Sequence, residues 1–264
     1  MEAGVYLPKL RWRTASCRTW RTLPFWWEDQ VKVVGVDGCR GGWIAIVWDT
    51  SAATVTPRFH ATFSEIVDSY PDAACIGIDI PIGLRDDGLP RSCDVDARQL
   101  LGWPRMASVF PAPQRQLLAC ANYSAATTLS RERFGRGVSR QAFGIFGKVA
   151  EVDQLITPAL QRRIVEVHPE LSLWTMNGRQ AMGYSKKLPE GFDERREQLA
   201  HHVHAEIPES CVAARQLAPF AAADDLLDAM TVAWTARRAA TQAANRIPAQ
   251  PELDARGLRM EIVY

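Results

Sequence analysis

Two aspartates occupy matching positions in this sequence. Asp37 and Asp79 each end a short apolar run, as Gly-Val-Asp and as Gly-Ile-Asp. A carboxylate beside a buried run is unfavourable unless it is paired, hydrogen-bonded or bound to a metal ion. Sites in open α/β sheets gather at the carboxyl ends of strands, and neighbouring strands lie roughly 5 Å apart. A single aspartate of this kind is explained by capping of a turn, whereas two such carboxylates raise each other's pKa and predict a shared cation.

A second acidic group opens the strongest predicted helix, over residues 221–244. Asp225 and Asp228 are three positions apart and therefore share one helix face. Asp224 or Asp225 is also explained as an N-cap that the helix dipole favours. Asp228 lies one turn inside an alanine-rich helix, where a core-facing carboxylate requires a partner. We expect that partner to be a metal ion, and we expect Asp225 and Asp228 to belong to the same site as the two strand-end aspartates.

Glu166 is a further acidic candidate, in a strand predicted over 163–168. Strand alternation places Glu166 and His168 on one face and two valines on the other. Two interpretations stay open for Glu166, a solvated edge strand or a functional role. His168 taken alone is typical of a hydrogen-bonded structural histidine, and Glu170 is typical of a helix start.

Basic residues are concentrated in one part of a chain whose net charge is only +1. Between Arg85 and Lys148, nine arginines and one lysine face five acidic residues, a net charge of +5. Arginine is suited to bidentate contact with phosphate, although a solvated surface explains the same pattern. The candidate substrate-binding residues are Arg40, Arg98, Arg115, Lys148 and Lys187.

Apolar patterning predicts an α/β domain over residues 31–264. The predicted strands cover 31–37, 43–48, 54–63, 74–79, 163–168 and 257–264. The predicted helices cover 64–70, 95–101, 113–128, 141–156, 192–205 and 221–244. The first three strands follow one another as hairpins, and the fourth is expected to lie parallel to the first through a right-handed crossover. No repeat or low-complexity linker divides the chain, so we expect one domain.

Residues 1–30 differ in composition, with four tryptophans and five lysines or arginines. A transit peptide is one interpretation, and a poorly ordered extension before the domain is the one we favour. Six cysteines without a C-x-x-C pair are typical of reduced thiols in a cytoplasmic protein. No run approaches the roughly 18 apolar residues of a membrane span, so no membrane association is expected.

Several short motifs of this sequence, taken together, resemble those of a known protein family. They are Gly35–Trp43, Ile78–Leu84, Cys93–Asp94, Ala97–Arg98, Ser108–Pro113, Lys148–Asp153, Glu166–Glu170, Ser185–Lys187 and Asp225–Ala229. In combination they resemble the predicted RNase H-like nuclease family, long catalogued as a domain of unknown function. The resemblance spans roughly residues 33–238. It implies a ribonuclease H-like fold, with a mixed five-stranded sheet flanked by helices and a helical insertion. It also implies metal binding by Asp37, Asp79 and Asp228, supported by Asp225 or Glu166.

The expected activity is hydrolysis of phosphodiester bonds in nucleic acid with Mg²⁺ or Mn²⁺. Two ions about 3.5–4 Å apart would activate water and stabilise the leaving oxygen, and Asp37 would bridge them. One alternative is an actin-like nucleotide-dependent phosphotransferase, against which the chain lacks a second Asp-Gly-Gly-Thr-type loop. The other is a non-catalytic nucleic-acid or regulatory binding module that keeps the acidic residues for stability.

Overall fold

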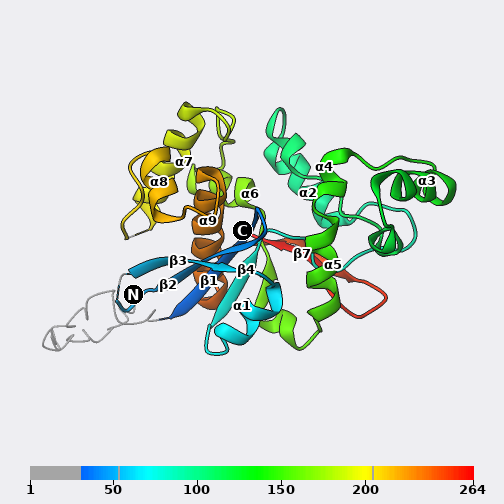
Figure 1. Cartoon of the computed structure of the whole chain (residues 1–264), viewed down its shortest axis with the longest axis horizontal. Helices are drawn as coiled ribbons and strands as arrows, with labels where there is room; N and C mark the ends of the chain where they lie inside the picture. Colours follow the sequence, from blue (N-terminus) through cyan, green and yellow to red (C-terminus); the bar gives the residue numbers. More distant parts are fainter. Residues whose placement is uncertain (1–30, 53, 204) are drawn as a thin grey trace, which may run out of the picture.

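A computed structural model describes residues 31–264 of the chain, except 53 and 204. The extension expected over residues 1–30 lies outside the described residues. The protein is an α/β protein whose main sheet has five strands in the order β3-β2-β1-β4-β5 (Figure 1). β1 pairs antiparallel with β2 and parallel with β4, and β4 pairs parallel with β5. The mixed five-stranded sheet and the parallel crossover between β1 and β4 are therefore confirmed.

The strands of the main sheet are β1 (Lys32–Cys39), β2 (Gly42–Asp49), β3 (Thr54–His60), β4 (Cys75–Ile78) and β5 (Ile164–Glu166). The chain ends in a separate two-stranded sheet, β6 (Arg246–Leu253) and β7 (Arg259–Val263). The sequence predicted β7 but not β6. The reason is that β6 contains two prolines and shows no clean alternation of buried and exposed residues.

The helices are α1 (Phe63–Ser69), α2 (Ser92–Leu101), α3 (Tyr123–Phe134), α4 (Arg140–Gly144), α5 (Phe146–Leu155), α6 (Pro169–Met176), α7 (Pro189–His202), α8 (Cys211–Leu217) and α9 (Ala223–Ala240). The sequence indicated only the start of α6, at Glu170, which lies in its first turn, and it did not predict α8. α6 follows β5 with almost no loop and starts at a proline, which fits the first turn of a helix. Within the described part of the chain, no helix is long and apolar enough to cross a bilayer.

Alternation along β1 divides the core between the two faces of the sheet. Val33 and Cys39 pack in a cluster with α9, whereas Val34 and Val36 pack in a cluster with α1 and α5. In Figure 1, α7, α8 and α9 gather on one side of the view, and α2–α5 of the insertion lie on the other. Because the period of a strand is two residues, Asp37 faces α9 together with Val33 and Cys39.

Two glycines let α9 approach the sheet closely. A Cβ on Gly35 would lie 2.2 Å from the carbonyl oxygen of Ala229, and one on Gly77 would lie 2.8 Å from Cγ1 of Val232. Side chains at these two strand positions would therefore push the helix away. Each glycine stands two residues before an aspartate on the same face of its strand. The repeated Gly-x-Asp pattern thus places the helix packing contact and the carboxylate next to each other on β1 and at the end of β4.

Candidate functional site

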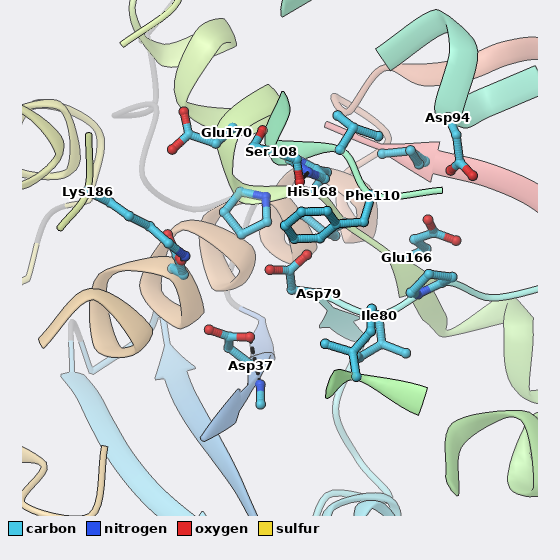
Figure 2. A pocket seen from close by; sticks show the side chains of 18 of the residues that line it. Asp37, Asp79, Ile80, Asp94, Ser108, Phe110, Glu166, His168, Glu170 and Lys186 are labelled. Carbon is cyan, nitrogen blue, oxygen red and sulfur yellow. Dashed lines mark hydrogen bonds and ion pairs between the residues drawn. The ribbon is translucent and has the colours of Figure 1, made fainter. Parts of the chain in front are cut away.

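A cavity of about 520 Å³ opens at the carboxyl end of β4, between α9 and the helical insertion. Asp37, Asp79 and Asp228 all line this cavity. Figure 2 shows the carboxylates of Asp37 and Asp79 near its centre, with Lys186 on one side and Glu166 on the other. The three aspartates that the sequence singled out from separate elements are therefore brought together.

The register of the sheet fixes the first two carboxylates. The backbone N–H of Asp79 donates to the carbonyl oxygen of Val36 at 3.0 Å, and Oδ1 of Asp37 accepts a hydrogen bond from the N–H of Gly38 at 2.6 Å. Burial raises the pKa of Asp37 well above its usual value, and the charges of Asp79 and Asp228 raise it further. Burial followed by the charge of Asp228 raises the pKa of Asp79 to about 7. Burial and the close approach of the carboxylates therefore both disfavour their charged forms unless a cation is present.

Asp228 supplies the third carboxylate from α9. It is only 2% exposed, and its Oδ2 forms an ion pair with Nζ of Lys186. The same ammonium group lies 3.9 Å from Oδ2 of Asp224. The charge of Asp228 is the largest of the influences that raise the pKa of Lys186. A lysine from another part of the chain is therefore the cation that Asp228 holds in this structure.

Asp225 is not among the described residues that line the cavity, and it has a local structural role. Ala222 precedes the helix, so Asp224 and Asp225 lie in its first turn rather than at the N-cap position that the sequence suggested. Oδ2 of Asp225 accepts the N–H of Ala222 at 3.2 Å. Burial and then the charge of Asp224 raise the pKa of Asp225. This carboxylate closes the first turn of α9 and adds negative charge near Asp37.

Glu166 lies on the opposite face of the sheet from α9. Its neighbours Val165 and Val167 pack in the cluster with α9, so alternation directs Glu166 away from that helix. Glu166 is 6% exposed, and both of its oxygens accept hydrogen bonds of 2.7 Å from Arg91. The solvated-edge interpretation is therefore wrong. Glu166 lines the same cavity as the three aspartates, but both of its oxygens are held in a buried ion pair with Arg91.

The five predicted substrate-binding residues separate into two groups. Lys148 and Lys187 line the cavity. Nζ of Lys148 lies 4.1 Å from the ring centre of Trp43 and donates to the carbonyl oxygen of Gly42. Burial lowers the pKa of Lys148. Both lysines are therefore placed to meet an anion that enters the cavity.

The three arginines of that set lie outside the cavity lining. Arg40 is exposed in the turn after β1. Arg98 donates to the carbonyl oxygen of Val109 at 2.8 Å. The guanidinium group of Arg115 forms ion pairs with Asp86, Asp153 and Asp254. The contacts of Arg98 and Arg115 are structural in this arrangement, and a role in substrate binding stays a prediction for all three arginines.

Sequence reasoning missed other residues that line the cavity. Nε of Arg105 donates to the carbonyl oxygen of Met182 at 2.8 Å, and Nη2 donates to that of Gly183 at 3.0 Å. This arginine ties the insertion to the loop that carries Lys186. Glu170, which is 7% exposed, forms an ion pair with Arg195. The adjacent lysines in Ser185-Lys-Lys were the available signal for Lys186, but nothing local indicated which acid it would meet.

The chemistry of the donors fits a hard divalent cation, because carboxylate oxygens are the ligands that Mg²⁺ and Mn²⁺ prefer. Among the described residues, no three His, Cys, Asp or Glu side chains are arranged to hold a metal ion as they stand. Asp228, moreover, is already paired with Lys186. A cation shared by all three aspartates therefore requires Asp228 to exchange its lysine partner.

Fold and site define the class of protein as an α/β protein with a mixed sheet and an acidic cavity at the strand ends. A family model described as a protein of unknown function (DUF429) matches residues 35–253. The chain belongs to this family. The match includes Asp37, Asp79 and Asp228 together with the loop that carries Lys186. No curated protein and no solved structure matches the chain.

Proposed function

We propose that the protein is a divalent-metal-dependent nuclease built on a ribonuclease H-like fold. The observation that carries this proposal is the convergence of Asp37, Asp79 and Asp228 in one cavity, from two parallel strands and the long helix α9. The mixed five-stranded sheet, with acids at the ends of β1 and β4 and on α9, supports this proposal, because the resemblance to the RNase H-like nuclease family implies such a sheet and these acids. The pKa values of Asp37 and Asp79 are raised first by burial and then by the neighbouring carboxylates, and a bound cation would offset both effects.

The acidic and the basic residues of the cavity would have different roles in the reaction. Asp37, Asp79 and Asp228 would hold Mg²⁺ or Mn²⁺, and Asp225 would support them from the first turn of α9. When bound, such an ion supplies an activated water and charge stabilisation for the leaving oxygen of a phosphodiester. Lys148 would place a positive charge on the cavity wall for a non-bridging phosphate oxygen.

Nucleic acid is the expected substrate because the acidic floor of the cavity is bordered by positive charge. Lys187 and Lys148 line the same cavity as the aspartates, and the side chain of Lys187 is 68% exposed. Phosphate contacts of this kind position a strand without reading its sequence. The proposal therefore predicts binding that weakens as the salt concentration rises.

A second candidate is a binding module without catalysis, and one observation favours it. The ion pair between Lys186 and Asp228 neutralises one carboxylate without any metal. An acidic cluster that a lysine neutralises in this way is stable in the folded protein without a metal ion and without a catalytic role. The two candidates differ in whether purified protein cleaves a phosphodiester bond.

The test is cleavage of end-labelled branched DNA, duplex DNA, single-stranded DNA and RNA–DNA hybrid in Mg²⁺, Mn²⁺ or EDTA. We expect metal-dependent cleavage of at least one substrate, with a loss of 10²-fold or more (order of magnitude) in Asp37→Asn. Asp72→Asn makes the same change on a carboxylate whose side chain is 61% exposed, and it should cleave like the wild type. Absence of cleavage in every condition would overturn the nuclease proposal. Hydrolysis of ATP in a parallel assay would favour the phosphotransferase alternative.

A further inference from the structure

We propose that Lys186 is an internal counter-ion of the carboxylate cluster and that a divalent cation displaces it from Asp228. This inference rests on the metal site of the proposed function and adds how that site is filled. Nζ of Lys186 pairs with Oδ2 of Asp228 and lies 3.9 Å from Oδ2 of Asp224. Figure 2 shows the lysine side chain reaching toward the part of the cavity that contains Asp37 and Asp79.

The two partners differ in their access to solvent. The Asp228 side chain is 2% exposed, whereas that of Lys186 is 36% exposed. A buried carboxylate without any cation is strongly unfavourable, so Asp228 needs a positive partner whenever metal is absent. The lysine can leave toward the open cavity, but the aspartate cannot leave the helix. Exchange therefore moves the lysine and keeps the carboxylate in place.

The backbone of the loop that carries Lys186 is held firmly. The carboxylate of Glu194 accepts hydrogen bonds from the N–H groups of Gly183 at 2.7 Å and Tyr184 at 3.0 Å. Arg195 donates to the carbonyl oxygen of Tyr184 at 3.1 Å. A Cβ on Gly191 would lie 1.9 Å from the carbonyl oxygen of Ser185, so α7 packs directly on the loop. Exchange therefore requires rotation of the flexible lysine side chain and no movement of the loop.

Charge gives the exchange its direction. A lysine brings one positive charge to a cluster that includes Asp37, Asp79 and Asp228, whereas a divalent ion brings two. The ammonium group of Lys186 and a metal ion compete for the same oxygen of Asp228. Lys186 therefore lowers the apparent affinity of the site for the metal ion. After exchange, the ammonium group would remain beside the cavity as a contact for an anionic oxygen of a substrate.

The experiment measures Mn²⁺ binding to the full chain without nucleic acid, from the electron paramagnetic resonance signal of free Mn²⁺. Lys186→Met removes the charge and keeps most of the length of the side chain. Lys186→Gln is the second variant, because its amide can still donate to Asp228 if the methionine variant fails to fold. Lys32→Met is the matched control, since Lys32 pairs with Asp72 at 2.7 Å outside the cavity and its side chain is 37% exposed, close to the 36% of Lys186.

We expect Lys186→Met and Lys186→Gln to bind Mn²⁺ about tenfold more tightly than the wild type or better, and Lys32→Met to change the affinity by less than about threefold. Wild-type or weaker affinity in a folded Lys186 variant would overturn the exchange and leave the metal site standing. Absence of Mn²⁺ binding in the wild type and in every folded variant would overturn the metal site itself.

Discussion

The backbone N–H of Asp79 donates to the carbonyl oxygen of Val36 at 3.0 Å, and this bond sets Asp37 and Asp79 side by side on neighbouring strands. Both aspartates face α9, because each follows by two residues a glycine against which that helix packs. Asp228 lies on α9 one turn before Val232, which packs against Gly77. The Gly-x-Asp pattern thus has two results: its glycine lets α9 pack against the strand, and its aspartate contributes a carboxylate to the cluster.

Gly35→Ala should weaken the protein through this contact. Its Cβ would lie 2.2 Å from the carbonyl oxygen of Ala229 and from the backbone nitrogen of Ala233, and backbone cannot move aside easily. We expect a loss of about 1–3 kcal/mol or more in the free energy of unfolding, measured with urea. Gly147→Ala is the control, because no atom lies within 4 Å of its added Cβ in α5. An alanine variant at position 35 with wild-type stability would contradict the packing argument.

Arg91 and Glu166 should behave as a structural pair. Arg91 is 2% exposed, and its guanidinium group bonds to Glu166 and to Asp94. Arg91→Met leaves both carboxylates without a cation and should lower the free energy of unfolding by about 3–5 kcal/mol. Glu166→Gln should cost about 1.5–3 kcal/mol, the range for a hydrogen bond to a charged group.

The same Glu166→Gln variant separates structure from metal binding. Because Arg91 already holds both oxygens of Glu166, the rise in melting temperature that Mn²⁺ produces should be unchanged. If the variant keeps wild-type stability and loses the response to Mn²⁺, Glu166 is a ligand and the structural assignment is wrong.

Asp225 should show two separable effects. Asp225→Ala removes the acceptor for the N–H of Ala222 and should lower stability in EDTA by about 0.3–1.5 kcal/mol. Asp225→Asn keeps an oxygen acceptor and should be nearly as stable as the wild type in EDTA. Both variants should bind Mn²⁺ more weakly, because each removes a negative charge near Asp37. Melting curves with EDTA and with Mn²⁺ measure the two effects, and equal stability of both variants in EDTA would contradict the capping role.

The stability of the metal-free protein should depend on pH through Asp79. Its pKa is about 7 in the folded protein, against about 3.9 for an aspartate in an unfolded chain. The folded state therefore holds this proton more tightly. The resulting stabilisation is fully present below about pH 4 and is lost as the pH rises through about 7.

Urea denaturation in EDTA from about pH 4 to about pH 8 measures this dependence. The difference in unfolding free energy between the wild type and Asp79→Asn isolates the contribution of Asp79 from those of other carboxyl groups. We expect that difference to shift in favour of the variant as the pH rises. A difference that is constant over the whole range would contradict the raised pKa.

Local patterns explain which parts of the fold and site the sequence could predict. The strand period and the Gly-x-Asp repeat indicated β1, β4 and their two aspartates, and the alanine-rich pattern indicated α9 with Asp228. Partners far apart in the chain left no such pattern. Lys186 is 42 residues from Asp228, and Arg91 is 75 residues from Glu166. Such pairs are decided by how the loop and the insertion fold over the sheet, which no local spacing encodes.

A crystal structure of the protein soaked in Mn²⁺, with the metal located by its anomalous signal, tests the metal site most directly. We predict a Mn²⁺ ion within about 2.0–2.6 Å of carboxylate oxygens of Asp37 and Asp79. We also predict that Asp228 contacts the ion and that Nζ of Lys186 has moved away from it. An anomalous peak elsewhere, or none while Lys186 remains on Asp228, would contradict a metal centre at this cavity.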